Sequence, residues 1–218
     1  ITPPYFDPFS TLKTLIHLTL TAILLVAMTK ENKEIKVVDF GGASGAHYFI
    51  AKKILGDKIK FRWAIVETQQ MVQKASVAQT HELRFFENIS DAQNELGAID
   101  LLHSYGALQY VPDPENTIAE IINSGAKFLC LNRLALLARN EKFLISIQES
   151  LLSANGPGPM PSGIKDGICR YPITYIGKEW LEGQISTGYR ITMNFGGTIV
   201  ESVNGHPIIN AGYFASKN

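Results

Sequence analysis

The stretch Val37–Gly45, with the sequence VVDFGGASG, decides the fold of this chain. Two β-branched residues and the acid Asp39 run into a glycine-rich turn, and a helical pattern begins at Ala46. Glycine allows a tight backbone turn and lets a ligand approach the main chain. The free N–H groups that open the next helix attract a carboxylate or a phosphate. The stretch therefore predicts the first strand–turn–helix unit of an α/β sheet that binds a cofactor.

Strand and helix patterns alternate on both sides of this turn. Alternation of this kind predicts right-handed βαβ units and a parallel sheet. The strand segments are almost wholly apolar, as expected when helices cover both faces. The predicted strands are Ile35–Phe40, Ile59–Val66, Leu83–Phe86, Ile99–Ser104 and Ala126–Leu131, and the predicted helices are Ala46–Leu55, Gln69–Gln79 and Pro114–Ser124.

The pattern changes after residue 132. We expect a helix at Glu141–Ala154 and then a Gly/Pro-rich loop at Asn155–Gly163, which is either a lid or a passive connection. A short helix is predicted at Lys178–Gln184. Tyr189–Phe195 and Pro207–Ala215 are predicted to form an antiparallel hairpin at the edge of the sheet.

The region before the first strand is predicted to be an extension. Ile1–Ser10 contains three prolines and reads as an extended arm, and a helix then runs to about Thr29. The apolar stretch Leu12–Met28 is interrupted by polar residues, so we expect no membrane span. The predicted organisation is an N-terminal cap over residues 1–33 and one domain over residues 34–218, in which residues 134–188 form the substrate or lid region.

Composition limits the classes of function. The 218 residues include 20 Lys and Arg and 20 Asp and Glu, and this zero net charge argues against a general nucleic-acid binder. Apolar residues make up 45% of the chain and charged residues 18%, which is typical of a globular protein. The two cysteines, Cys130 and Cys169, are expected to be reduced thiols in a cytoplasmic protein.

The glycines can be tested against the dinucleotide fingerprint G-x-G-x-x-G. Counted from Gly41, its second and third glycines fall on Ala43 and Ala46, so only one of three matches. Asp39 would lie badly beside a pyrophosphate, whereas it suits a ligand with a cationic amino group. An NAD(P)-dependent oxidoreductase is therefore the weaker of two alternatives.

The segment Asp39–Gly45 (DFGGASG) resembles the first motif of class I S-adenosylmethionine (SAM)-dependent methyltransferases, acid-x-Gly-x-Gly-x-Gly, with Ala43 in place of the middle glycine. The resemblance implies a Rossmann-like, doubly wound α/β sheet of seven mostly parallel strands, in the order 3-2-1-4-5-7-6 with strand 7 antiparallel. It also implies SAM as cofactor and S-adenosylhomocysteine (SAH) as product. The run Leu108–Pro114 is similar to a small subgroup of uncharacterised bacterial putative methyltransferases.

The same resemblance implies cofactor contacts at the carboxyl ends of the first four strands. Asp39 would hold the amino group of the methionine part, Glu67 the ribose hydroxyls, and the residues after the third strand the adenine. The full set of implied cofactor-binding residues is Asp39, Phe40, Gly41, Gly42, Ala43, Gly45, Glu67, Thr68, Glu87, Asn88 and Ser104.

Methyl transfer is an in-line displacement in which the protein mainly positions donor and acceptor. His103, at the end of the fourth predicted strand, is the candidate general base; the alternative is a buried histidine with satisfied partners. Tyr105 could orient the acceptor, cover the sulfonium or only pack against the cofactor. Arg133 could bind an anionic acceptor or form a surface salt bridge. Tyr110 is a second candidate for substrate binding.

The histidines show no metal-ligand spacing, so no metal is expected. The predicted activity is SAM-dependent methyl transfer to oxygen or nitrogen of a small-molecule or saccharide-like acceptor. The alternatives are a non-catalytic, cofactor-binding member of the fold and the oxidoreductase. We expect no nucleic-acid partner, and a homodimer is one form of assembly left open.

Overall fold

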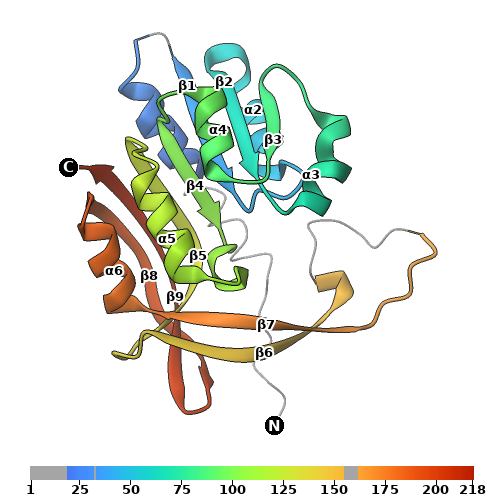
Figure 1. Cartoon of the computed structure of the whole chain (residues 1–218), viewed down its shortest axis with the longest axis vertical. Coiled ribbons are helices and arrows are strands. Elements are labelled where there is room, and N and C mark those ends of the chain that lie inside the picture. The colour runs from blue at the N-terminus through green and yellow to red at the C-terminus, as the bar shows by residue number, and fades with distance from the viewer. Residues whose placement is uncertain (1–18, 32, 155–161) are drawn as a thin grey trace.

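A single twisted sheet runs through the computed structural model, which describes residues 19–31, 33–154 and 162–218. Its first half consists of parallel strands in the order β3-β2-β1-β4-β5 (Figure 1). These strands are β1 (Glu34–Phe40), β2 (Lys60–Val66), β3 (Leu83–Phe86), β4 (Leu101–Tyr105) and β5 (Phe128–Leu137).

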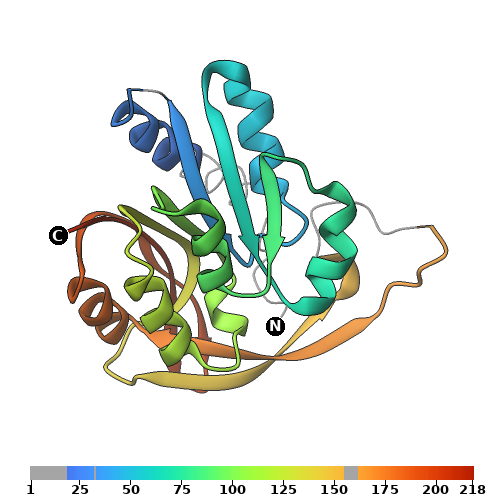
Figure 2. The ribbon, with the colours of Figure 1, turned by 45° about the horizontal axis from the view of Figure 1, so that its top comes forward.

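The second half of the sheet contains two hairpins. β9 (His206–Lys217) pairs antiparallel with β5 along most of its length, and β8 (Tyr189–Val203) pairs antiparallel with β9. β6 (Phe143–Leu151) and β7 (Ile168–Gly177) form the other hairpin, and β7 joins β5 only at its last residues. The β6–β7 hairpin extends away from the rest of the sheet (Figures 1 and 2).

The predicted fold class is confirmed, although the sheet has nine strands where seven were expected. Without the β6–β7 hairpin, the order is β3-β2-β1-β4-β5-β9-β8. This order is the predicted 3-2-1-4-5-7-6, and β9 is the antiparallel strand. The β6–β7 hairpin is thus an addition between the fifth strand and the last two.

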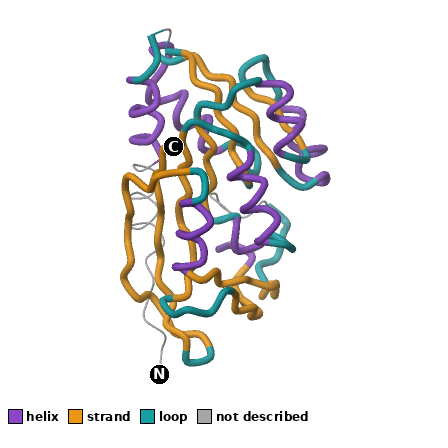
Figure 3. The backbone as a smooth tube through the Cα atoms, turned by 60° about the vertical axis from the view of Figure 1, so that its left-hand side comes forward, coloured by secondary structure: helices purple, strands orange, loops and turns teal. Residues whose placement is uncertain are grey.

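Helices cover both faces of the sheet (Figure 3). Alternate residues of each strand point to opposite faces, so Val38 and Leu102 belong to one core cluster while Val37 and Leu101 belong to the other. The first cluster includes residues of α4 (Ile89–Leu96), α5 (Pro114–Asn123) and α6 (Lys178–Ser186). The second includes residues of α2 (Ala46–Leu55), α3 (Gln69–Ala75) and the helical segment 19–28.

The helix predicted at Glu141–Ala154 is wrong, because this region is mainly strand β6. Exposed residues alternate with half-buried ones along the strand, as at Ile145 and Ile147, and this is the period of a strand. Pairing with β7 satisfies its backbone. The sequence prediction also missed α4, a helix of only two turns whose N-cap is Asn88.

The other predicted elements are found, most with small shifts at their ends, although β5 runs six residues beyond its predicted end at Leu131 and α3 stops four residues before its predicted end at Gln79. α2 and β3 have the predicted bounds, and the C-terminal hairpin is longer than expected. The predicted N-terminal arm and most of the predicted Gly/Pro loop lie outside the described residues. Within the described ranges, no helix combines the length and the apolar character needed to cross a membrane.

The core packing around β4 gives a stability prediction. Leu102 has 0% exposure, so Leu102→Ala leaves a cavity and should lower the free energy of unfolding by about 2–5 kcal/mol. Ile145 is 68% exposed, and Ile145→Ala should change it by no more than about 0.5 kcal/mol. Urea denaturation followed by circular dichroism measures both. Equal effects of the two substitutions would contradict this description of the core.

Candidate cofactor crevice

The glycine turn after β1 is packed tightly on two sides. The N–H of Gly41 donates to the carbonyl of Val66 at 2.9 Å, which joins the turn to the end of β2. Gly41 has φ +71°, and a Cβ at this position would overlap the Cβ of Ala107. A Cβ on Gly42 would lie 2.6 Å from Oδ2 of Asp39. Both positions therefore exclude a side chain.

Ala43, the residue that departs from the methyltransferase motif, adopts a left-handed backbone conformation with φ +49°. A glycine would adopt this conformation at less cost. The N–H of Ala43 donates to Oε1 of Glu67 at 3.1 Å, and the N–H of Thr68 donates to Oε2 at 3.0 Å. The acid at the end of β2 thus lies directly against the turn at the end of β1.

The residues that follow β3 lie at the same edge of the sheet. The N–H of Glu67 donates to the carbonyl of Phe86 at 2.9 Å, which brings the ends of β2 and β3 together. Glu87 is exposed, and Phe40 is half-buried. Asn88 caps α4, because its Oδ1 accepts the N–H of Asp91 at 2.8 Å. The predicted adenine contacts are therefore next to Glu67, and Asn88 also has a structural role.

Asp39 points away from this edge, into the layer between the sheet and the segment 19–28. Its carboxylate accepts hydrogen bonds from Nδ1 of His103 at 2.8 Å and from Nε1 of Trp63 at 3.2 Å. Burial alone would raise the pKa of Asp39, but the charge and hydrogen bond of His103, the charge of His47 and the hydrogen bond of Trp63 together hold the pKa below its usual value. Asp39 is thus a buried carboxylate with 0% exposure.

His103 also has 0% exposure, and both of its ring nitrogens have partners. Nδ1 binds Asp39, and a hydrogen bond of 2.9 Å joins Nε2 to the hydroxyl of Thr19. This geometry favours the second of the two sequence-based alternatives, a buried histidine with satisfied partners. The predicted role of His103 as general base would require one of these hydrogen bonds to open.

His47 completes this cluster, although no motif in the sequence marks it. Its Nδ1 lies 3.8 Å from Oδ2 of Asp39 and has no hydrogen-bond partner among the described residues. Its ring centroid is 4.8 Å from that of His103 and 5.1 Å from that of Tyr105. Burial and the neighbouring charge of His103 lower the pKa of His47 to about 4. Its place in the first turn of α2, beside the glycines, is the signal that could have identified it.

Four buried polar atoms without partners belong to residues of β4, of the segment that follows it and of the middle of β5. Within the described residues, no hydrogen bond reaches the side-chain oxygens of Ser104, Tyr105, Gln109 and Asn132. Buried polar groups usually have partners. Ser104 and Tyr105 end β4, at the carboxyl edge where ligands of parallel sheets bind, so a polar ligand there could pair with these two hydroxyls.

Arg133 lies beside Tyr105 and Gly106. It is an L-residue with φ +54°, at an irregularity in the pairing of β5 with β9. Its guanidinium carbon is 5.7 Å from the centroid of the Tyr105 ring. Tyr110 is farther out, and its hydroxyl donates to Gln148 of β6 at 3.0 Å. Arg133 and Tyr105 are therefore brought together, while Tyr110 links the site region to the β6–β7 hairpin.

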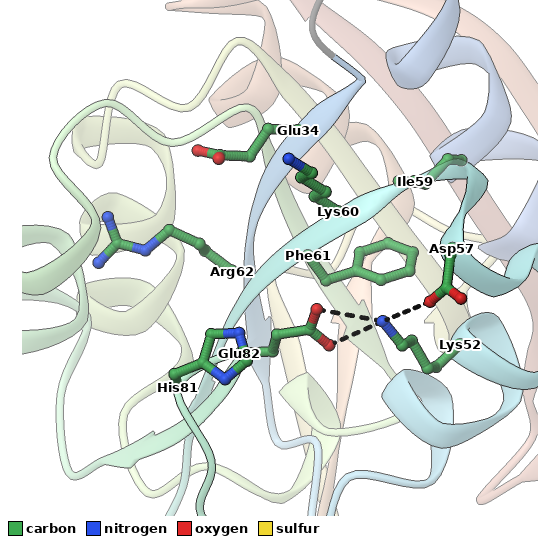
Figure 4. A pocket seen from close by; sticks show the side chains of 9 residues that line it. All are labelled: Glu34, Lys52, Asp57, Ile59, Lys60, Phe61, Arg62, His81 and Glu82. Atoms are coloured by element: carbon green, nitrogen blue, oxygen red, sulfur yellow. Dashed lines mark hydrogen bonds and ion pairs between the residues drawn. The ribbon is translucent and has the colours of Figure 1, made fainter.

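A separate hollow of about 520 Å³ lies at the opposite end of β2 (Figure 4). It contains none of the predicted site residues. Lys52 forms ion pairs there with Asp57 and Glu82, at 3.7 and 3.0 Å. Figure 4 shows these charged groups turned toward one another, so the hollow's charges compensate each other within the protein.

No family model matches this sequence, and no curated protein matches it. Solved structures do match. A SAM-dependent methyltransferase from Clostridium acetobutylicum is 11% identical, with a TM-score of 0.52 over 92% of this chain and 91% of that chain. A SAM-bound amino pentose methyltransferase from Micromonospora echinaspora is 12% identical, with a TM-score of 0.52 over all of both chains.

A third match is magnesium protoporphyrin IX methyltransferase from Synechocystis with bound SAM. It is 12% identical, with a TM-score of 0.51 over 93% of this chain and 79% of that chain. At these identities the likeness shows the fold. The chain therefore has the Rossmann-like α/β fold that these methyltransferase structures have.

The close packing of Gly41 gives a second prediction. Gly41→Ala should destabilise the protein by about 1–2 kcal/mol of backbone strain and by roughly 1–3 kcal/mol more from the overlap with Ala107. Gly56→Ala is the matched control, because Gly56 also has a positive φ, +56°, but no atom lies within 4 Å of its added Cβ. Chemical denaturation of both variants measures the difference. Equal losses would show that the turn is not tightly packed.

Proposed function

We propose that this chain binds SAM at the carboxyl ends of β1, β2 and β4 and transfers its methyl group to a small-molecule acceptor. The observation that carries the proposal is the contact between Glu67 and Ala43. It brings the acid of the second strand onto the glycine turn of the first, and these are the two elements that the methyltransferase motif requires. The likeness to SAM-bound structures supports the same cofactor.

The residues at this edge fit such a cofactor. Helix α2 has Gly45 as its N-cap, with no side-chain cap and no acid in the first turn. Its free N–H groups therefore favour the methionine carboxylate. Glu67 would bind the ribose hydroxyls, and Thr68, Glu87 and Asn88 would border the adenine. Ser104 has a buried hydroxyl without a partner near the predicted sulfonium position.

In this proposal Asp39 acts on the cofactor through the backbone. A Cβ added to Gly42 would lie 2.6 Å from Oδ2 of Asp39, so the carboxylate supports the turn from below. His103 orients Asp39 through the 2.8 Å hydrogen bond. The turn formed by Phe40, Gly41, Gly42, Ala43 and Gly45 then faces the cofactor with its main chain.

When bound, SAM supplies an electrophilic methyl group, and the chain's contribution is to hold an acceptor in line with it. Oriented reactants of this kind reach effective molarities of about 10⁵–10⁸ M. Tyr105 is placed to contact the acceptor because its ring packs against both His47 and Arg133. Its hydroxyl is buried without a partner and is available to an acceptor oxygen or nitrogen.

The acceptor side of the proposal rests on Arg133. Its left-handed backbone costs free energy, and strain of this kind persists where a side chain must point in one direction. A guanidinium next to a tyrosine ring suits a polar acceptor with an anionic or hydroxylated group. A saccharide-like acceptor fits this description, and the matched methyltransferase from Micromonospora echinaspora acts on an amino pentose.

Membership of a subgroup of bacterial methyltransferases, a cytoplasmic location and a homodimer belong to the same proposal. One observation favours the non-catalytic alternative: the candidate base, His103, has both nitrogens bound. That alternative predicts SAH binding without turnover on any acceptor.

The cofactor is tested by calorimetric titration of the chain with SAH and with NADH. SAH should bind, and Glu67→Ala should weaken it by about 10–100-fold, the loss of a hydrogen bond to a charged group. Glu95→Ala, on the surface of α4, should bind SAH as the native chain does. Binding of NADH with no response to SAH would reverse the assignment.

Arg133→Gly separates strain from function. Glycine adopts φ +54° freely, so the variant should keep the free energy of unfolding within about 1 kcal/mol of the native value. SAH affinity should also be unchanged. Release of SAH in an acceptor screen should fall, because the guanidinium is lost. Full turnover by Arg133→Gly would exclude Arg133 from acceptor binding.

A further inference from the structure

Three side chains with metal-binding atoms meet beneath the glycine turn. Asp39 comes from β1, His47 from α2 and His103 from β4, and one ligand atom of each lies within 4.8 Å of the others. The shortest separations are 2.8 Å between Asp39 Oδ1 and His103 Nδ1 and 3.8 Å between Asp39 Oδ2 and His47 Nδ1. Ligand atoms about 2.1 Å from one tetrahedral ion are about 3.4 Å apart, so the Asp39–His103 pair would have to open and the more distant pairs to close for all three atoms to reach one ion.

Each possible ligand except His47 has a second partner that would orient it. Trp63 donates its indole N–H to Oδ2 of Asp39 at 3.2 Å. Nε2 of His103 is 2.9 Å from the hydroxyl of Thr19. Nδ1 donates to Asp39, so a metal ion would displace the Nδ1 proton, and an Nε2–H that donates to Thr19 would then leave the Nδ1 lone pair to the ion. Metal-binding histidines and carboxylates commonly have such outer hydrogen bonds, which fix the tautomer and the ring orientation.

The cluster also has an unmet requirement. The carboxylate of Asp39 has 0% exposure and is already paired with His103 and Trp63. His47 Nδ1 is buried and has no hydrogen-bond partner among the described residues, although it faces this carboxylate. A cation between the three side chains would give His47 Nδ1 the partner that it lacks.

We propose that Asp39, His47 and His103 bind one divalent transition-metal ion, with Zn²⁺ as the best match. Two imidazole nitrogens and one carboxylate oxygen form a ligand set that Zn²⁺ accepts, and they leave a fourth position for water. The side chain of His47 retains 16% exposure, which provides a route for the ion from solvent.

The position of the ion gives it a structural role. It would tie the first turn of α2 to β1 and β4 from below, and so fix the glycine turn that Asp39 already supports. The site is separate from the cofactor site proposed above, since its ligands lie under the turn. Metal content can therefore be measured without any cofactor or acceptor, and the two proposals can fail independently.

The experiment uses the full chain with any affinity tag removed. Metal is stripped with a chelator, and Co²⁺ is titrated as a spectroscopic probe and then displaced by Zn²⁺. We expect one equivalent of Co²⁺ to bind with visible absorption typical of tetrahedral coordination. His47→Gln should weaken binding by more than about 100-fold, because it removes a ligand where even outer partners contribute about 10–100-fold.

Two further variants make the result specific. Trp63→Phe removes the N–H that orients Asp39, together with part of a buried ring, and it should weaken Co²⁺ binding by about 10–100-fold. His81→Gln removes an exposed histidine at the far end of β2 and should leave the affinity unchanged. Circular dichroism confirms that each variant is folded, and Zn²⁺ should raise the melting temperature of the native chain and of His81→Gln only.

Native protein that is folded yet binds neither Co²⁺ nor Zn²⁺ would overturn the proposal, and the cluster would then be a hydrogen-bonded network alone. Equal affinity in the native chain and His47→Gln would overturn it as well, because the ion would be bound elsewhere.

Discussion

The hydrogen bond between Asp39 and His103 is the interaction on which the site region depends. The two residues are directly opposite in the register of β1 and β4, so the bond crosses the centre of the parallel sheet. Thr19 extends it to the helical segment 19–28, and Trp63 extends it to β2. A buried carboxylate is expensive unless it is fully paired. Four segments distant in sequence are therefore held in one arrangement by a single charged group.

The shape of the cofactor edge follows from this arrangement. Because Asp39 lies directly beneath Gly42, the turn has to pass over the carboxylate without a side chain. The main chain then rises to Ala43, where Glu67 meets it from β2. The proposed methyl donor would contact a main chain whose position is fixed by the buried Asp39 carboxylate. The acceptor would approach from the side of Tyr105 and Arg133.

Much of the fold was readable from the sequence because periodicity and glycine positions are local signals. The bounds of α2 and the presence of the C-terminal hairpin, although not its full length, followed from them. The strand β6 did not, because Phe143–Leu151 forms a strand through its pairing with β7, a contact between residues far apart in the chain. The direction of the Asp39 side chain could be predicted in part, because Asp39 and Val37 are two residues apart in β1 and point to the same face of the sheet. This is the face covered by α2, α3 and the segment 19–28. The contact between His47 and Asp39 depends on how α2 packs on the sheet, and the spacing of residues along the sequence does not determine this packing.

The β6–β7 hairpin has a practical consequence for work on the protein. β6 ends the strand order of the described sheet and exposes Ile145 and Ile147 to solvent. Outermost strands with apolar side chains invite association between molecules in concentrated solution. Lysine or glutamate at these two positions would leave the interior untouched. Such surface engineering offers a route to better-behaved samples for crystallography and for nuclear magnetic resonance.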